Sequence, residues 1–159
     1  MMLGTFLAVV LAAGGSADAL ASYRVKNVQL QVPAAWKHGV EDGSHKFTAP
    51  SGDGYFVVDV GAVQTAGMKA DVCVDKIVAS IGGANWERLK VGGQPAAKRS
   101  DTDAAPDGSG TVESLTYVGC DGKTTWSVVF YLEQGKKERF APLAQKVGTS
   151  VKIQRAGGK

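Results

Sequence analysis

The sequence predicts an α+β fold, an antiparallel β-sheet with helices on both of its faces. Strand patterns occupy most of the chain, a strong hairpin signal lies near residue 121, and only two segments repeat apolar residues at helical spacing. Without its leader the chain keeps roughly 140 residues, the size of one domain with one core. We therefore expect a single domain from 22 to 153, followed by a polar tail from 154 to 159.

The first 21 residues are typical of a cleavable signal peptide. Leu3 to Ala13 is an uncharged apolar run, about half the length that a membrane-spanning helix needs. Small residues follow and offer cleavage after Ala21, which would leave Ser22 as the mature N-terminus, or after Ala19. The basic residue that usually precedes the apolar run is missing, and a buried N-terminal strand or helix is the alternative interpretation. We expect an extracytoplasmic product, periplasmic or secreted.

The first half of the domain predicts three strands. Residues 23–32 alternate largely between apolar and polar side chains and end at Pro33, after which a polar turn follows Trp36. Residues 45–49 form a short strand, and residues 55–63 are rich in β-branched and aromatic side chains. The Pro and Gly residues at 50–54 indicate the turn between these last two strands.

A helix is predicted next, over residues 68–81. Cys73, Ile77 and Ile81 recur at four-residue spacing, and the Gly82-Gly83 pair supplies a C-terminal stop. The spacing places Cys73 on the face that packs against the core.

Two hairpins follow. Residues 86–91 and 94–101 are joined by two glycines, and residues 111–120 and 123–133 by Asp121-Gly122, a pair that type I′ turns prefer. A two-residue turn in the second hairpin would pair Tyr117 with Trp126 and Leu115 with Val128 on one face, with Cys120 on the other.

A second helix is expected from Ala141 to Thr149, before a short terminal segment at 150–153. Pro142 is acceptable in a first turn, and Leu143 and Val147 would face inward.

Cys73 and Cys120 are expected to form a disulfide. An exported protein meets an oxidising compartment, there is no C-x-x-C pair, and neither histidine lies at ligand-like spacing from a cysteine. The bridge requires the first helix to cover the sheet face that carries Cys120, with Cα atoms about 4.4–6.8 Å apart. Because no cysteine lies at the expected mature N-terminus, we expect a soluble product without a lipid anchor.

The whole chain has a formal net charge of +3, and its basic residues concentrate in the last quarter. They could attract an anionic partner such as a membrane surface, a cell-wall polymer or an acidic protein, although the solvated face of a helix is the favoured interpretation. No aromatic residues are interleaved with the charges, which together with export argues against nucleic acid. The candidate patch comprises Lys136, Lys137, Arg139, Lys146, Lys152 and Arg155.

No catalytic, cofactor-binding or metal-binding residue is predicted, and no bound cofactor is expected. Motifs such as G-x-S-x-G, H-E-x-x-H or a phosphate loop are missing from the sequence. The acidic segment from Asp101 to Asp107, with Glu113 beyond it, departs from calcium-loop spacing and favours a solvated loop. His38 and His45, with Glu41 and Asp42 between them, could form a surface metal site, but two histidines in a polar turn are more often simply exposed. No other group of side chains in the sequence is a candidate for metal binding or catalysis.

The order of these elements resembles the PsbP-like superfamily. The similarity rests on a first strand ending at Pro33 and Trp36, a hairpin, one helix, a long antiparallel meander and a final F-x-x-L-x-x-x-V-x-x-S-V-K-I segment from Phe140 to Ile153. The similarity covers nearly the whole mature chain, and it lies in the order of the elements rather than in a sequence motif. It implies a helix–sheet–helix sandwich that serves as a binding or accessory module, and it assigns no functional residue.

We therefore expect an exported, non-enzymatic, monomeric domain without a transmembrane segment that binds a protein or cell-envelope partner. A small extracytoplasmic hydrolase using His38 or His45 is an alternative, and it would need a cleft that brings either histidine within hydrogen-bond reach of Asp or Ser. A secreted inhibitor-like factor is another, and it would show a protruding loop at Thr102 to Gly110.

Overall fold

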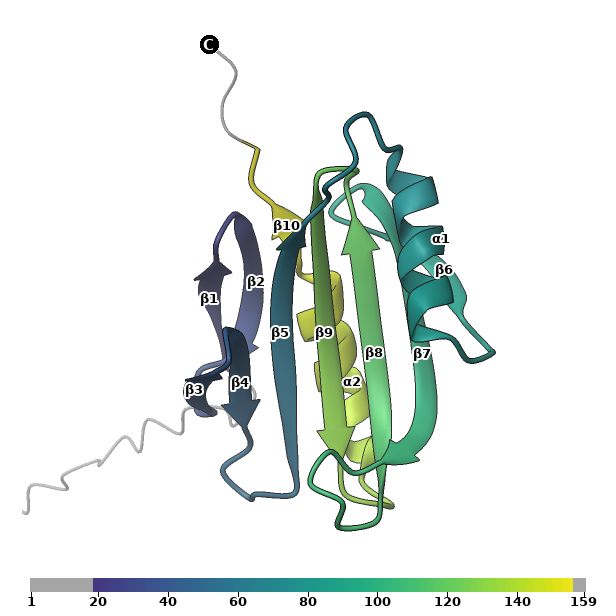
Figure 1. Cartoon of the computed structure of the whole chain (residues 1–159). Helices are drawn as coiled ribbons and strands as arrows, with labels where there is room; N and C mark the ends of the chain where they lie inside the picture. The colour runs from purple at the N-terminus through teal and green to yellow at the C-terminus, as the bar shows by residue number, and fades with distance from the viewer. Residues whose placement is uncertain (1–18, 156–159) are drawn as a thin grey trace, which may run out of the picture.

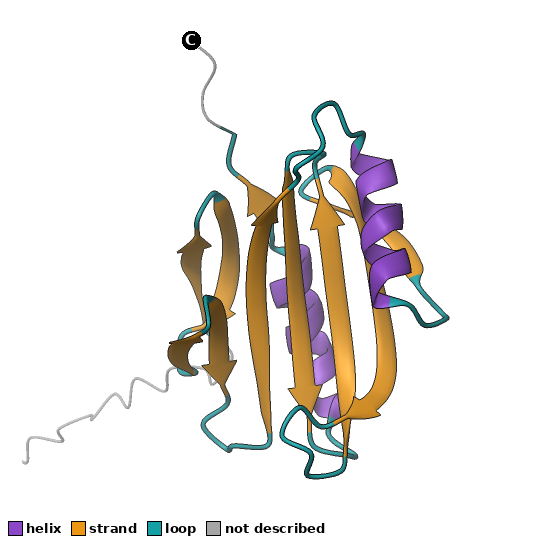
Figure 2. Ribbon diagram, in the orientation of Figure 1, coloured by secondary structure: helices purple, strands orange, loops and turns teal. Residues whose placement is uncertain are grey.

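The computed structural model describes residues 19–155, which form two antiparallel β-sheets and two α-helices (Figures 1 and 2). A large sheet has the strand order β3-β4-β5-β9-β8-β7-β6, and a small sheet has the order β1-β2-β10. Most of the expected signal peptide (1–18) and the end of the tail (156–159) lie outside the described residues. The elements are β1 (Leu20–Val25), β2 (Val28–Pro33), β3 (Lys37–Glu41), β4 (Ser44–Thr48), β5 (Gly54–Ala62), α1 (Ala70–Ile81), β6 (Glu87–Val91), β7 (Gln94–Ala104), β8 (Thr111–Cys120), β9 (Thr124–Leu132), α2 (Lys137–Thr149) and β10 (Lys152–Ile153).

The first predicted strand is in fact a hairpin of β1 and β2. Val25 pairs with Val28 across a two-residue turn in which Lys26 has a φ of 52°. Both valines are buried, so the apolar pattern of the sequence continues across the turn and gives no sign that the strand ends there. Strand β10 pairs with β2 and completes the small sheet.

The predicted polar turn after Trp36 contains strand β3. It pairs with β4 around Asp42 and Gly43, whose φ angles are 50° and 81°. All five residues of β3 are exposed because the strand lies at the edge of the large sheet. An exposed edge strand carries no alternation of buried and exposed side chains, which is why the sequence pattern did not indicate it.

The β8–β9 hairpin forms as predicted, but its register differs by two residues. Tyr117 pairs with Val128 rather than Trp126, and Trp126 lies opposite Gly119. The connecting loop is longer than a two-residue type I′ turn because the carboxylate of Asp121 accepts hydrogen bonds from the backbone N–H groups of Lys123 and Thr124. A shift of two residues keeps every side chain on its expected face.

Helix α2 begins four residues earlier than predicted, at Lys137. Glu113 of β8 accepts hydrogen bonds from the backbone N–H groups of Gly135 and Lys137, so a carboxylate satisfies donors at the start of the helix. Pro142 therefore lies in the second turn, where it cannot donate the hydrogen bond that an ordinary residue would make to Glu138.

Two separate hydrophobic cores lie on opposite faces of the large sheet. The larger one packs Phe56, Val58, Val128 and Phe130 against α2 and the small sheet. The smaller one packs α1 against β7 and β8. The α+β class and the antiparallel sheet are thus confirmed, but neither face is a complete helical layer. The small sheet shares one face with α2, and α1 covers only one side of the other (Figure 1).

Candidate functional site

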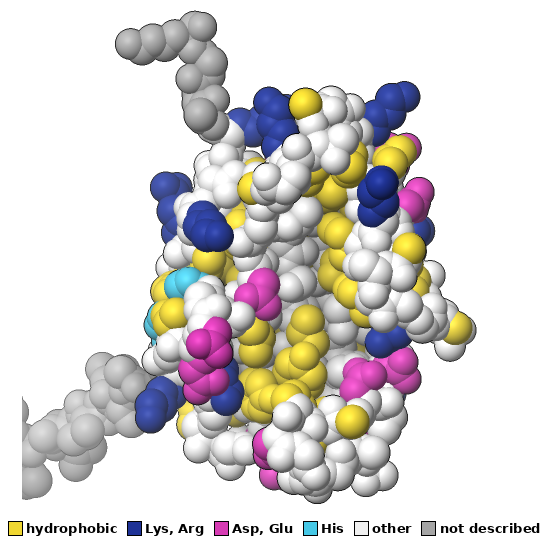
Figure 3. Space-filling view, in the orientation of Figure 1, with side chains coloured by type: hydrophobic (Ala, Val, Ile, Leu, Met, Phe, Trp, Pro, Cys, Tyr) yellow, Lys and Arg dark blue, Asp and Glu magenta, His cyan; other side chains and the backbone are white. Residues whose placement is uncertain are grey.

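The part of the large sheet that α1 leaves uncovered exposes a row of side chains from β5 and β9. Tyr55 pairs with Tyr131, and Val57 pairs with Val129. Their neighbours along each strand point into the larger core, so these four point to the opposite face, where all are half-buried. We call them the open sheet face. Figure 3 shows apolar side chains gathered on this side of the molecule, between α1 and the β3–β4 hairpin.

The two tyrosines make the open sheet face aromatic and amphipathic. Their rings stack with centroids 5.2 Å apart, and the Lys46 ammonium lies 4.4 Å from the centroid of the Tyr55 ring. Burial raises the pKa of both phenols; for Tyr55 the neighbouring Tyr131 adds to the effect, and for Tyr131 the carboxylate of Asp103 does. Both therefore stay protonated at neutral pH and keep an O–H to donate. Ordered tyrosines with an apolar ring and a polar tip are enriched at protein interfaces.

One end of the open sheet face is an acidic cleft of about 490 Å³. Its carboxylates come from Glu41, Asp42 and Asp107, and the ammonium of Lys46 is its single positive charge. The cleft has a negative balance that favours a cationic group of a ligand. Its lining residues are Glu41, Asp42, Ser44, Lys46, Tyr55, Val57, Pro106, Asp107 and Tyr131.

The loop that the sequence proposed as a protruding element partly closes this cleft. Residues 102–104 of the predicted loop belong to β7, and the remaining loop is fastened by hydrogen bonds from Ala105 N–H to the Gly110 carbonyl and from Gly108 N–H to the Ala105 carbonyl. Pro106 and Asp107 then line the cleft. The segment from 102 to 110 is therefore part of β7 and of the cleft wall rather than a protruding loop.

The carboxylates near the predicted acidic loop have protein partners. The guanidinium of Arg99 lies 3.5 Å from Asp101 and 3.8 Å from Asp103, and Ser114 also donates to Asp103. Glu113 is used at the start of α2. Within residues 19–155, no three His, Cys, Asp or Glu side chains gather in a metal-binding group.

His38 and His45 are brought together by the β3–β4 hairpin. Their hydrogen-bond partners among the described residues are each other and Tyr23 of β1, and neither histidine reaches a serine or an aspartate. Partial burial, followed by the proximity of His38, lowers the pKa of His45. The sequence did not indicate Tyr23, because its contact with the histidines joins the small sheet to the large one.

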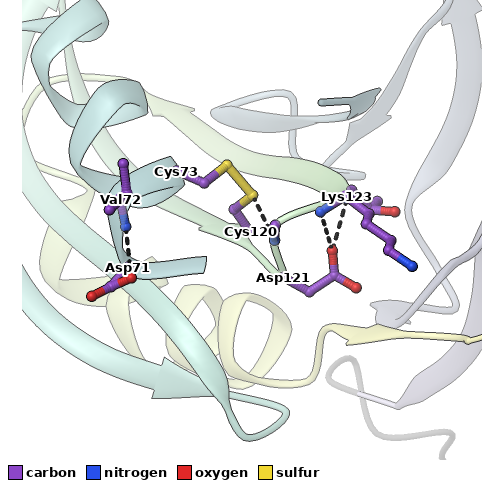
Figure 4. The surroundings of a disulfide bond; sticks show 8 residues. Asp71, Val72, Cys73, Cys120, Asp121 and Lys123 are labelled. Atoms are coloured by element: carbon purple, nitrogen blue, oxygen red, sulfur yellow. Dashed lines mark hydrogen bonds between the residues drawn. A yellow bond between two sulfur atoms is a disulfide. The ribbon is translucent and has the colours of Figure 1, made fainter. Parts of the chain in front are cut away.

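The predicted disulfide between Cys73 and Cys120 is confirmed, with a Cα–Cα distance of 6.1 Å. Figure 4 shows Cys73 reaching from α1 to Cys120 at the end of β8, beside the Asp121 carboxylate that orders the following loop. Both cysteines lie in the small core under α1. Neither helix of residues 19–155 is long and apolar enough to cross a membrane.

The six basic residues of the candidate patch lie in two groups. Lys136, Lys137 and Arg139 are at the start of α2, where Arg139 and Lys136 lie 2.6 Å and 4.0 Å from the Asp53 carboxylate. Lys146 is in the last turn of α2, and Lys152 and Arg155 follow the helix. The first group is thus partly neutralised, whereas Lys152 and Arg155 line clefts at the other end of the molecule.

The chain matches no protein-family model, and no curated protein is significantly similar to it. Its fold is similar to several solved structures. Cyanobacterial PsbP from Synechocystis sp. PCC 6803 is 14% identical over 95% of this chain and 98% of that one, with a TM-score of 0.62. A crystal structure from Bacteroides thetaiotaomicron is 19% identical over 84% of this chain and 47% of that one, with a TM-score of 0.60, so the chain spans less than half of that protein. A mutant of the protein Mog1 is 12% identical over 85% of this chain and 96% of that one, with a TM-score of 0.50. The chain therefore has a PsbP-like fold, as the sequence predicted.

Proposed function

We propose that this PsbP-like domain is an exported, non-enzymatic accessory module that binds a protein partner through its open sheet face. The observation that carries the proposal is the half-covered sheet, in which Tyr55, Val57, Val129 and Tyr131 form an apolar strip beside α1. Solvent-exposed apolar strips with polar rims are typical of interaction sites.

The partner that best fits this surface is a polypeptide segment with apolar and basic side chains. Apolar side chains would pack on the stacked tyrosines and the valines, and a lysine or arginine would find Glu41, Asp42 and Asp107 at the cleft. Three carboxylates and one ammonium line the cleft, so the acidic side chains dominate the electrostatic potential there.

Export is supported by the signal-like N-terminus together with the disulfide, because such bonds persist in oxidising compartments. Strand β1 begins at Leu20, two residues before the N-terminus expected after cleavage at Ala21. Cleavage after Ala19 would leave β1 whole. Mass spectrometry of the mature chain distinguishes the two sites.

Site-specific photo-crosslinking tests the proposal directly. A photoreactive residue in place of Val57 or Val129 should give one discrete covalent adduct with a protein partner in the cell that makes this chain. The same residue in place of the exposed Gln145 on α2, on the far side of the sheet, is the matched control and should give none. Equal adducts from both surfaces, or no adduct from the open sheet face, would contradict the proposal.

A second candidate surface is the cationic end of the molecule, as the sequence proposed for an anionic partner. Lys123, Lys152 and Arg155 line two clefts that share Asp121, whose carboxylate is occupied by backbone N–H groups. An anionic partner would be attracted there, and loss of its binding in a Lys152→Ala/Arg155→Ala variant is the corresponding test.

The hydrolase alternative gains no support from the geometry. A general base needs the proton that it removes within hydrogen-bond reach, and the two histidines contact Tyr23 and each other instead of a serine.

A further inference from the structure

The chain has only two histidines, and the β3–β4 hairpin places them diagonally across its two strands. His38 pairs with Phe47 and His45 with Val40, so both histidines point to the same face of the hairpin. Their rings are nearly parallel, with an interplanar angle of 14° and centroids 5.4 Å apart. Figure 3 shows the histidines reaching the molecular surface at the margin of the molecule.

Tyr23 reaches these histidines from β1, which belongs to the other sheet. Its Oη lies 3.0 Å from His38 Nε2 and 3.1 Å from His45 Nδ1, and the two nitrogens are 3.2 Å apart. An edge-to-face contact with Phe47, centroids 5.1 Å apart, holds the Tyr23 ring in place. One oxygen and two nitrogen atoms, from three different strands, therefore form a nearly equilateral triangle.

Protons alone cannot satisfy all three sides of this triangle. A protonated imidazole nitrogen is a donor and not an acceptor, and a bare nitrogen is only an acceptor. The phenol can accept from one ring and donate to the other, which satisfies two sides with roughly linear hydrogen bonds. The third side, between the two nitrogens, is left without a proton directed along it. A single cation bonded to all three atoms would remove this conflict, because each atom would then act only as a ligand.

The dimensions of the triangle fit a tetrahedral transition-metal ion. A triangle with edges of about 3.1 Å has its corners about 1.8 Å from its centre, so an ion about 1 Å above that centre would lie about 2.1 Å from each atom, the distance typical of zinc and its nitrogen ligands. Imidazole nitrogens are ligands that zinc and copper favour. The Tyr23 phenol would release its proton to solvent as the metal–oxygen bond forms, and the resulting phenolate supplies a compensating negative charge.

We propose that Tyr23, His38 and His45 bind one divalent transition-metal ion, Zn²⁺ or Cu²⁺, with the fourth position open. The ion would fasten β1 of the small sheet to the β3–β4 hairpin of the large sheet. The site does not depend on the open sheet face, because the triangle lies on the other side of the hairpin: His45 alternates along β4 with Lys46, which lines the acidic cleft.

Metal titration of the untagged, disulfide-bonded chain tests this site, since no other histidine competes. Calorimetry with ZnCl₂ and CuCl₂ should show one ion per chain. His38→Gln and His45→Gln should each weaken binding at least tenfold, and Val40→Thr, an exposed neighbour on the same face, should leave it unchanged. Tyr23→Phe should keep the ring contact with Phe47, weaken binding, and abolish a phenolate-to-copper charge-transfer band present in the wild-type Cu²⁺ complex.

Nuclear magnetic resonance of the wild-type chain keeps the test decisive if a histidine variant fails to fold. Both imidazole spin systems should shift together on addition of one equivalent of Zn²⁺. Unmoved imidazole signals, or equal metal affinity in the folded His38→Gln and wild-type chains, would overturn the site. A Cu²⁺ complex without the charge-transfer band would overturn the role of Tyr23.

Discussion

Gly119 shows how one residue type can decide the packing between two strands. It lies opposite Trp126, and a Cβ at this position would meet the indole ring at 2.4 Å. Trp126 is 3% exposed, so Gly119→Ala must displace a core side chain. We expect a loss of about 1–3 kcal/mol in the free energy of unfolding, measured by urea denaturation.

Gly39→Ala is the matched control for this substitution. A Cβ on Gly39, in the exposed edge strand β3, would have no atom within 4 Å, and we expect a change within about 0.5 kcal/mol. Equal losses at the two positions would show that strand propensity, rather than contact with Trp126, determines the cost.

Asp53 makes folding stability depend on pH at the acid end. The hydroxyl of Ser51 and then the Arg139 guanidinium favour the ionised carboxylate and hold its pKa below the usual value, against the opposing effect of burial. An aspartate whose pKa is lowered by folding stabilises the native state above its unfolded pKa, and this contribution disappears as the pH falls through the folded pKa. Asp53→Asn should therefore be less stable than wild type at pH 7 and approach it at acid pH, as the pH falls through the lowered pKa of Asp53. Denaturation curves that differ by the same amount at both pH values would contradict this.

At the scale of elements, helix α1 depends on its disulfide because the core beneath it is small. Its small core has five buried residues, two of which are Cys73 and Cys120. Closing a loop with a sequence separation of 47 residues stabilises the fold by about 4 kcal/mol in the chain-entropy model. Cys73→Ala/Cys120→Ala should lose stability of this order, and hydrogen exchange should accelerate in α1 before it does in α2.

Reduction of the wild-type disulfide is the control for these substitutions and should reproduce the same pattern of exchange. Exchange that accelerates equally in both helices would mean that the bond restrains the whole domain rather than α1.

The elements that the sequence predicted well have a repeating pattern of their own. Helix α1, strand β5 and both later hairpins follow from four-residue spacing, β-branched runs and Gly-containing turns. The strands and turns that it missed leave no such pattern in the sequence. Lys26 has positive φ without being a glycine, β3 is exposed along its whole length, and the Asp121 side chain lengthens a turn that its sequence favours as short.

At the scale of the whole molecule, the candidate sites could not be predicted because they join distant segments. Tyr55 meets Tyr131 only because β5 pairs with β9 across the intervening α1, β6, β7 and β8. Likewise, Tyr23 meets the histidines where two sheets adjoin. The sequence pattern indicated which residues face which side of a strand and which successive strands form hairpins, but not which strands distant in the sequence are neighbours.

The whole-molecule claim, that the open sheet face binds the partner, is tested most directly by comparing partner affinity in two variants. Val57→Thr/Val129→Thr removes apolar surface while keeping side-chain shape and strand propensity, and Lys152→Ala/Arg155→Ala removes charge at the cationic end. With the crosslinked partner as ligand and thermal unfolding as the check on folding, we predict about a tenfold loss of affinity in the first variant, a difference of about 1.4 kcal/mol, and none in the second. Unchanged affinity in the first variant together with a loss in the second would contradict the account and place the partner at the cationic end.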